Sequence, residues 1–414
     1  MSSPAFRSLP LSTTQLSLAA VLRCGQSFRW SVLPLSDQHS PHEYRLCLRD
    51  RVVCLRQTSD TLLYRSVYLP QPSSPKEEAV KDAETLAWIR DYFQLDVDLM
   101  ELYSQWSSMD PVFEKVKDRF EGIRILRQDP FECLLSFICS SNNNISRITK
   151  MVQSLCTQYS PPLLSLPPPK DGTEGPLVPY HPFPPPSALA APEVAAKLRS
   201  LGFGYRADFI QKTAKMLVDA HGNDTSTSMQ EPAEKWLLTL RQLSTSDART
   251  ELLKFMGVGR KVADCVLLMS LDKREVVPVD THVHQIAVKH YGLPGSSKSK
   301  ATMTPKLYDD VSMKLVEKWG DYAGWAHSVL FTSDLKAFAN YGLDGSSSSP
   351  SLSKIAMPSS ASPSPTKRKR ATTKAVEGNT VTDAVASTVE EFDELSLAER
   401  VKRRRQVCLK VSAK

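Results

Sequence analysis

A tight glycine turn between two apolar segments limits the possible folds of this chain more than any other feature. Gly257 and Gly259 flank a valine, and Lys261 follows two residues later. Because glycine has no Cβ, both glycines can adopt positive φ and let another backbone approach closely. The residues on either side, 251–255 and 262–269, have helical apolar spacing. The pattern predicts two helices joined by a turn whose N–H groups can hold a phosphate.

An acidic residue in a second motif can complement this lysine. Asp280 follows the apolar residues 276–279, and we expect it to begin another helix. A lysine in the first turn of a helix lies near the positive end of the dipole, which favours the neutral, nucleophilic amine. Such an amine can form a Schiff base while a carboxylate stabilises positive charge. The simpler alternatives are that Lys261 is a solvated charge and that Asp280 is only a helix N-cap.

A dinucleotide-binding turn is a competing interpretation of the same residues. The spacing of Gly257, Gly259 and Asp280 approximates the glycine-rich fingerprint with its distant acid. Such a turn must follow a buried strand, but residues 235–243 and the segment ending at Met256 have helical spacing, and the third glycine is missing. The helical hairpin is therefore the favoured interpretation, and a dinucleotide-dependent enzyme remains an alternative.

Several further motifs occur in the order of one known family. They comprise residues 25–30, 92–96, 128–130, 137–145, 204–207 and 322–326. Together with the glycine hairpin and residues 277–280, they resemble the eukaryotic 8-oxoguanine DNA glycosylase/AP lyase family of the helix-hairpin-helix, Gly/Pro-Asp DNA glycosylase superfamily. The resemblance runs over roughly residues 10 to 340, and its ordered motifs are far more specific than the hairpin alone.

The predicted fold class is α+β. We expect an N-terminal α+β domain over residues 1–112, with antiparallel strands near 43–48, 52–55 and 61–69. A mostly α-helical helix-hairpin-helix glycosylase domain is expected over 113–342, and a disordered basic tail over 343–414. Residues 161–192 hold 12 of the 29 prolines, which predicts a helix-free surface insertion within the helical domain.

Cysteine and histidine spacing argues against a metal site. The eight cysteines are scattered and no signal peptide precedes them, so we expect a reduced, intracellular setting. No paired cysteines accompany His282, His284 and His290, and we expect these histidines on a helix surface rather than as ligands. We therefore predict no metal and no other cofactor. No apolar run of about 18 residues occurs, so we expect no membrane span.

Positive charge is concentrated in the tail. Residues 345–414 hold 13 lysines and arginines against 7 acidic residues, so the rest of the chain contributes only +1 to the net charge of +7. Affinity of the folded part for nucleic acid must then come from a local face and backbone amides. The clusters 367–370 and 402–405 predict binding to a nuclear import receptor and a nuclear location. The first 36 residues lack acids, which is compatible with a mitochondrial presequence.

The resemblance implies a substrate and a set of site residues. The expected partner is double-stranded DNA with an oxidised guanine opposite cytosine, bound by a monomer that flips the base and forms a lysine Schiff base. Lys261 and Asp280 are the implied catalytic residues. The implied base pocket holds Gly25, whose carbonyl would accept the added N7 hydrogen, the sandwiching pair Cys265 and Phe331, and also Met269, Pro278 and His327. The implied DNA contacts are Asn142, Arg147 and Arg206 at the orphaned cytosine, Tyr205 as a wedge, and Gly257, Gly259 and His282 at the backbone.

Two positions depart from the family pattern. The family has glutamine where this chain has His327, and an imidazole cannot donate and accept in the geometry of an amide. Met256 replaces a common proline before the hairpin, which should loosen the turn. Two further alternatives stay open: a glycosylase that prefers ring-opened purines, and a noncatalytic helix-hairpin-helix DNA-binding protein.

Overall fold

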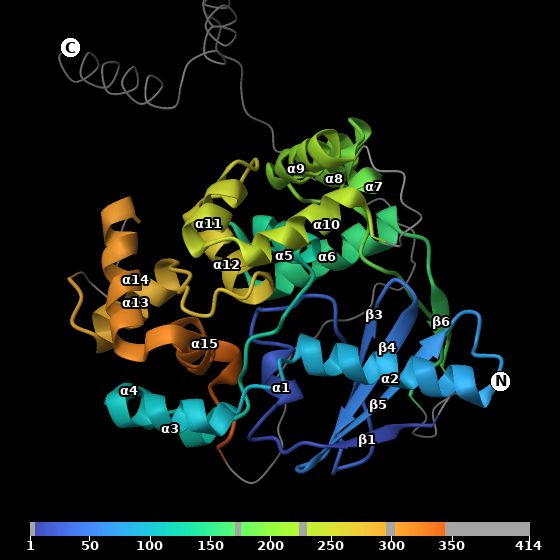
Figure 1. Cartoon of the computed structure of the whole chain (residues 1–414), viewed down its shortest axis with the longest axis horizontal. Helices are drawn as coiled ribbons and strands as arrows, with labels where there is room; N and C mark the ends of the chain where they lie inside the picture. The colour runs from blue at the N-terminus through green and yellow to red at the C-terminus, as the bar shows by residue number, and fades with distance from the viewer. Residues whose placement is uncertain (1–4, 170–174, 223–229, 295–302, 344–414) are drawn as a thin grey trace, which may run out of the picture. The chain divides into compact units, whose positions relative to one another are not determined.

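The computed structural model describes residues 5–169, 175–222, 230–294 and 303–343, and Figure 1 shows their arrangement. The strands are β1 (Arg7–Pro10), β2 (Ser31–Pro34), β3 (His42–Cys47), β4 (Arg51–Gln57), β5 (Thr61–Tyr68), β6 (Leu164–Leu166) and β7 (Val178–Tyr180). The α-helices are α1 (Leu18–Val21), α2 (Pro75–Tyr92), α3 (Leu99–Met109), α4 (Pro111–Glu114), α5 (Pro130–Ser140), α6 (Ile145–Tyr159), α7 (Pro186–Ala190), α8 (Glu193–Ser200), α9 (Arg206–His221), α10 (Pro232–Thr239), α11 (Thr245–Leu253), α12 (Arg260–Ser270), α13 (Thr281–His290), α14 (Pro305–Trp319) and α15 (Ala323–Asp334). Short 3-10 helices are η1 (Lys117–Arg119), η2 (Leu240–Gln242), η3 (Gly320–Tyr322) and η4 (Lys336–Phe338).

The N-terminal strands form an antiparallel sheet with the order β1-β5-β4-β3-β2. Successive side chains of a strand point to opposite faces, and β4 is buried on both. Val53 and Leu55 belong to the core beneath α2, which Figure 1 shows lying across the sheet. Val52 and Cys54 pack on the other face with Leu166 of β6. The predicted sheet is confirmed, and the structure adds β1 and β2 at its edges.

The proline-rich segment differs from its prediction. The helix-free expectation for residues 161–192 is wrong at α7, which begins at Pro186. Proline is compatible with the first turn of a helix because the amide hydrogen it lacks has no intrahelical partner there. The segment is also not purely superficial, since β6 pairs with β7 and Arg45 of the sheet donates to the Pro167 carbonyl at 2.7 Å. Tyr180 is 5 % exposed, so the segment covers the second face of the sheet.

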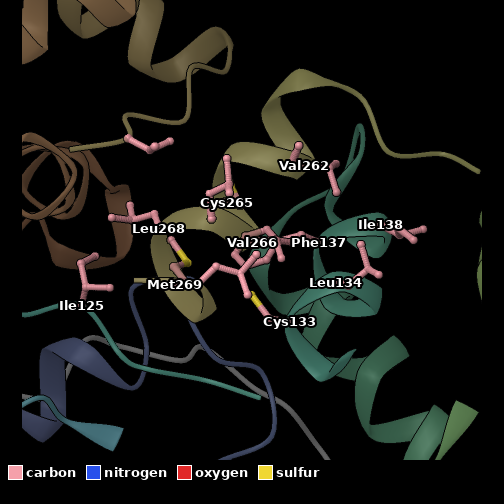
Figure 2. Packing of buried hydrophobic residues seen from close by; sticks show 14 of the residues in the cluster. Ile125, Cys133, Leu134, Phe137, Ile138, Val262, Cys265, Val266, Leu268 and Met269 are labelled. Carbon is pink, nitrogen blue, oxygen red and sulfur yellow. The ribbon is translucent and has the colours of Figure 1, made fainter. Parts of the chain in front are cut away.

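The helical region is built around α5 and α12, whose apolar side chains interlock as Figure 2 shows. Asp264 anchors α12 to its other neighbours, because its carboxylate is 1 % exposed and accepts from Arg249 Nε at 2.6 Å and Tyr308 Oη at 2.7 Å. A buried carboxylate with these charged and hydroxyl partners is strongly held. The direction of the first turn of α12 is thereby fixed. The α+β fold class is confirmed.

Several expectations concern regions that the structure does not describe. The expected disordered tail lies outside the described residues except for Leu343. The domain boundaries at 112 and 342 stay predictions. None of the described helices is both long and apolar enough to cross a bilayer.

Candidate functional site

The glycine turn lies between α11 and α12, as the helical pattern predicts. Gly257 has φ +79°, and a Cβ there would lie 2.4 Å from Phe209 Cδ2. Gly259 differs from the expectation of positive φ, because it is extended, with φ −94°, and serves as the N-cap of α12. Nothing lies within 4 Å of the position that its Cβ would take. Only Gly257 therefore needs to be glycine for the fold, while Gly259 leaves open space in front of the helix N-terminus.

The residues around the turn bear on the dinucleotide-binding alternative and on Met256. A helix precedes the turn, so the dinucleotide-binding alternative, which needs a strand there, is wrong. Met256 is 42 % exposed, and its carbonyl accepts a hydrogen bond from Thr213 Oγ1 at 3.0 Å. This bond ties the turn to α9 through a backbone oxygen, which a proline would also offer, so the expected loosening by Met256 stays a prediction.

Lys261 is the second residue of α12 and reaches across to α5. Its Nζ donates to Ser140 Oγ at 3.1 Å and lies 5.1 Å from the centroid of the Phe137 ring. A hydroxyl acceptor and an aromatic face both stabilise a charged amine. The amine is therefore held against α5 by a hydrogen bond and an aromatic face. Ser140 and Phe137 lie within the motif of residues 137–145, but the motif alone does not indicate a role for either side chain.

Asp280 is the N-cap of α13, as the simpler interpretation proposes. One oxygen, Oδ1, accepts from the amides of His282 and Val283, both at 2.9 Å. The cap fixes the orientation of the carboxylate, since its two bonds come from backbone atoms. Pro278 is buried just before it, and the Val279 amide donates to Tyr308 Oη at 3.1 Å. Capping therefore positions the acid and does not exclude a chemical role.

Cys265 lies one turn beyond Lys261 and is 3 % exposed. Burial raises the pKa of its thiol to about 11, opposed by the positive charge of Lys261 and reinforced by Asp280. The thiol is therefore neutral near pH 7, which suits an apolar wall. Met269, one further turn along the same helix, is 8 % exposed. The two pocket residues predicted on α12 thus lie along one buried stretch.

His327 of α15 faces this site from the other side. Burial lowers the pKa of its imidazole to about 4, an effect that Asp280 opposes and that His282 and Lys261 reinforce. The Gly324 carbonyl opposes the lowering of this pKa. Neither ring nitrogen, however, has a partner with hydrogen-bond geometry in the described chain. Lys261, Asp280 and His282 all lie near enough to His327 to affect its charge. The predicted site residues of α12, α13 and α15 are therefore close together.

Phe331 of α15 packs against the rings of His327 and His282. The Phe331 ring lies 5.9 Å from the His327 ring and 5.1 Å from the His282 ring, in an edge-to-face arrangement with the latter. His282 Nε2 is 3.2 Å from Asp334 Oδ2, an ion-pair distance without hydrogen-bond geometry. Its neighbour His284 is 2 % exposed, so the expectation of a surface position is wrong for that histidine.

Gly25 enters the site on a loop between α1 and β2. It has φ +93°, and a Cβ would lie 3.0 Å from Ile145 Cδ1. The loop is bonded to α12 through Gln128, whose side chain donates to the Gln26 carbonyl at 3.0 Å and whose amide donates to the Met269 carbonyl at 2.8 Å. Gly25 is thereby linked to the predicted pocket wall despite its distance in sequence.

The three residues predicted at the orphaned cytosine and the predicted wedge Tyr205 lie at or just before the starts of α6 and α9. Asn142 has φ +49° in the loop between α5 and α6, and Arg147 Nη2 donates to the Gly202 carbonyl at 3.1 Å. Tyr205 is 48 % exposed, and its hydroxyl donates to the Ser141 carbonyl at 3.1 Å. These contacts bring the loop between α5 and α6 against the turn before α9.

Arg206 binds the same loop from a buried position. It is 3 % exposed and donates to the carbonyls of Ser141, Asn142 and Phe203. Its guanidinium also lies 4.6 Å from the Tyr205 ring centroid. In this structure Arg206 therefore shapes the loop that carries Asn142. A sequence motif cannot distinguish this role from direct contact with a base.

Two cavities of the described chain lie elsewhere. One, of about 280 Å³, is lined by residues that include Lys289 and His290, and the other, of about 510 Å³, by residues that include Thr13 and Tyr341. Neither is lined by Lys261 or Asp280. No cluster of three or more candidate metal-binding side chains occurs among the residues described.

Comparison with known proteins identifies relatives over most of the chain. A family model described as the 8-oxoguanine DNA glycosylase N-terminal domain matches residues 8–134, and one described as HhH-GPD superfamily base excision DNA repair protein matches 135–307. An N-glycosylase/DNA lyase of Saccharomyces cerevisiae is 37 % identical over 349 residues, covering 80 % of this chain and 86 % of the relative. N-glycosylase/DNA lyase OGG1 of Arabidopsis thaliana is 36 % identical over 338 residues, covering 81 % of each.

Solved structures agree with this relationship. The apo form of the Clostridium acetobutylicum 8-oxoguanine glycosylase/lyase has a TM-score of 0.59 and 27 % identity, covering 80 % of this chain and 99 % of that one. The same enzyme in complex with double-stranded DNA containing cytosine opposite 8-oxoguanine has a TM-score of 0.59 and 26 % identity, covering 80 % and 98 %.

The two hairpin glycines should respond differently to a methyl group. Gly257→Ala combines a left-handed backbone with a clash against Phe209, and we expect it to lower the free energy of unfolding by about 2 kcal/mol or more. Gly259→Ala is extended and meets open space, so its effect should stay within about 0.5 kcal/mol. Urea unfolding of both variants measures the difference, and equal losses would contradict this account of the turn.

Proposed function

This chain belongs to the N-glycosylase/DNA lyase family of base-excision repair enzymes, and we propose that it excises 8-oxoguanine opposite cytosine from double-stranded DNA. It is a bifunctional DNA glycosylase with lyase activity, so the noncatalytic alternative is wrong. The observation that supports this proposal best is the position of the Lys261 amine in the first turn of α12. The Asp280 carboxylate, which caps α13, and the Lys261 amine both lie near enough to the His327 imidazole to affect its charge. The lesion and the roles of individual residues belong to the proposal.

Base flipping is the first step that the proposal requires. A base stacked in a duplex cannot reach Lys261, so the enzyme must extrude it. Exposed Tyr205 can wedge into the stack, while Asn142 and Arg147 offer amide and guanidinium groups to the orphaned cytosine. Arg206 can join them once its donors leave the loop carbonyls that they now bind. The contacts between the start of α6 and the start of α9 support this proposal because they hold these groups together.

Recognition of the oxidised base is assigned to Gly25. Its carbonyl would accept the hydrogen that oxidation adds at N7. Normal guanine has a lone pair at N7, so two acceptors would face each other and repel. The base would lie between Cys265 and Phe331, with Met269 and Pro278 closing the pocket. The neutral thiol and the partly buried ring suit an aromatic plane.

Lys261 and Asp280 carry the chemistry. The amine forms a bond to C1′ of the sugar while the bond from C1′ to the base nitrogen breaks and its electron pair leaves with the base. Asp280 stabilises the positive charge that develops on the sugar. Loss of the amine proton and opening of the sugar ring give an imine. Removal of a C2′ proton then expels the 3′ phosphate by β-elimination and nicks the strand.

A borohydride trap tests the nucleophile. Borohydride delivers a hydride to the imine carbon and makes the protein–DNA bond permanent. We expect wild-type protein to crosslink to a duplex with 8-oxoguanine opposite cytosine, and Lys261→Gln to give no crosslink because an amide cannot form the imine. An uncrosslinked wild type, or a crosslinked Lys261→Gln, would overturn the assignment. Asp280→Asn is the matched variant, since asparagine still caps α13. It should slow base release about 100-fold while DNA affinity stays within about threefold.

The imidazole of His327 is the reason to consider ring-opened purines as a second class of substrate. The imidazole is neutral near pH 7 and can donate from one nitrogen and accept at the other, in a geometry unlike that of an amide. A ring-opened purine opposite cytosine offers different donors and acceptors at the edge that this residue faces. Preference for ring-opened purines therefore remains the competing proposal.

Single-turnover base release decides between the two lesions. The rates for 8-oxoguanine and for ring-opened guanine, each opposite cytosine, are compared for wild type and His327→Gln. We expect the glutamine to raise the rate ratio in favour of 8-oxoguanine by about fivefold, the worth of one hydrogen bond. An unchanged ratio would show that His327 does not read the base.

The location proposal rests on the tail. We propose that a monomeric enzyme enters the nucleus through residues 367–370 and 402–405, with mitochondrial delivery as a second route. Alanine substitution of both clusters in a fluorescent fusion should reduce the nuclear fraction several-fold, because receptors recognise the clustered charge. Alanine at Lys410 and Lys414 is the control, since it removes tail charges outside the clusters. Equal nuclear fractions would refute the role of the clusters.

A further inference from the structure

The loop of Gly25 is held by two other parts of the chain. Its backbone has φ +93° at Gly25, and a Cβ there would lie 3.0 Å from Ile145 Cδ1 at the start of α6. Gln26, the next residue, is 2 % exposed. The Gln26 side chain accepts from the Leu126 amide and donates to the Arg124 carbonyl, both at 3.0 Å. The loop therefore packs against α6 and is hydrogen-bonded to the segment that precedes α5.

The backbone of Gln128 belongs to the same segment and is anchored on α12. Its amide donates to the Met269 carbonyl at 2.8 Å, and its carbonyl accepts from Arg241 Nη2 at 3.3 Å. Arg241 Nε donates in turn to the Ser270 carbonyl at 2.8 Å. These bonds fix the backbone of Gln128 to the last turn of the helix that carries Cys265 and Met269 (Figure 2).

The side chain of Gln128 makes a separate contact with the loop. Its Nε2 donates to the Gln26 carbonyl at 3.0 Å, and the residue is 4 % exposed. This carbonyl is the next one along the chain after that of Gly25. Because peptide units are planar, the φ and ψ angles of Gln26 alone relate the two carbonyl groups. The hydrogen bond from Gln128 therefore controls the distance of the Gly25 carbonyl from α12.

We propose that Gln128 is a positioning residue that sets the selectivity of the base pocket by holding the Gly25 carbonyl at a fixed distance from α12. This role rests on the proposed function, in which the carbonyl reads N7 of the base. A carbonyl that cannot retreat accepts the N7 hydrogen of 8-oxoguanine and repels the N7 lone pair of guanine. If the loop could move back, the hydrogen bond would lengthen and the repulsion would fall. The difference in affinity between the two bases would then shrink.

Binding to duplexes that cannot react tests this role. The probes carry a 2′-fluoro nucleotide of 8-oxoguanine or of guanine opposite cytosine, because the fluorine opposes positive charge on the sugar and blocks base release. The ratio of the two Kd values measures selectivity without chemistry. Gln128→Met keeps the length of the side chain and removes its donor. We expect this variant to lower the selectivity for 8-oxoguanine about fivefold, the effect of one hydrogen bond.

The matched control is Gln211→Met. The Gln211 side chain is 8 % exposed on α9 and donates to the Ala190 carbonyl of α7 at 2.7 Å, so it makes a buried bond of the same kind. Neither α7 nor α9 carries a proposed base-pocket residue. Gln211→Met should lower the melting temperature to a similar extent and keep the wild-type Kd ratio. A ratio that falls equally in both variants would overturn the proposal.

An abasic duplex separates positioning from a general disturbance of the fold. Such a duplex has no base for the Gly25 carbonyl to read, so borohydride trapping on it should stay within about twofold of wild type in Gln128→Met. A loss of trapping that parallels the loss of 8-oxoguanine binding would show a purely structural role and would refute the positioning of Gly25.

The proposed function and the role of Gln128 fail in different ways. If the enzyme does not select 8-oxoguanine, wild-type protein binds the two fluorinated duplexes equally. If only the role of Gln128 is wrong, wild type and Gln128→Met discriminate to the same degree. Should Gln128→Met fail to fold, Gln26→Met removes the side-chain bonds to Arg124 and Leu126 and should lower the selectivity in the same direction. An unchanged ratio in that variant would also overturn the proposal.

Discussion

The candidate site depends on the hydrogen bonds of Gln128. This residue is 4 % exposed; its side-chain amide donates to the Gln26 carbonyl and its backbone amide donates to the Met269 carbonyl. Gln26 in turn binds the Leu126 amide and the Arg124 carbonyl, so the loop of Gly25 is held on both sides. A buried amide group without a partner lowers the stability of the fold by about 1–3 kcal/mol, so displacement of this loop is strongly disfavoured. A few hydrogen bonds that do not involve the sheet therefore fix the position of Gly25 relative to α12.

Sequence patterns predicted those parts of the site that depend on local geometry. The turn at Gly257, the position of Lys261 in the first turn of a helix and the cap at Asp280 follow from short-range rules, and the structure has all three. Patterns could not distinguish Gly257 from Gly259, because the clash that requires a glycine comes from Phe209, far earlier in the chain.

Long-range contacts explain the other differences from prediction. His284 is buried by packing that helical spacing alone does not reveal. The helix α7 is a local exception, since Pro186 occupies its first position, where proline is tolerated. The Ser140 contact with Lys261 joins residues 121 positions apart, so no local motif indicates it. The roles of the predicted DNA-contacting residues remain proposals, since their chemistry depends on a duplex.

The isolated imidazole of His327 links recognition to stability. It is 8 % exposed, and neither nitrogen has a hydrogen-bond partner in the described part of the chain. A buried polar group in that condition lowers the stability of the fold by about 1–3 kcal/mol. A base with matching groups would relieve this penalty on entering the pocket. In the proposed role of His327, an apolar side chain of similar size would give a more stable protein that could not hydrogen-bond the base edge, so stability and selectivity would oppose each other at this position.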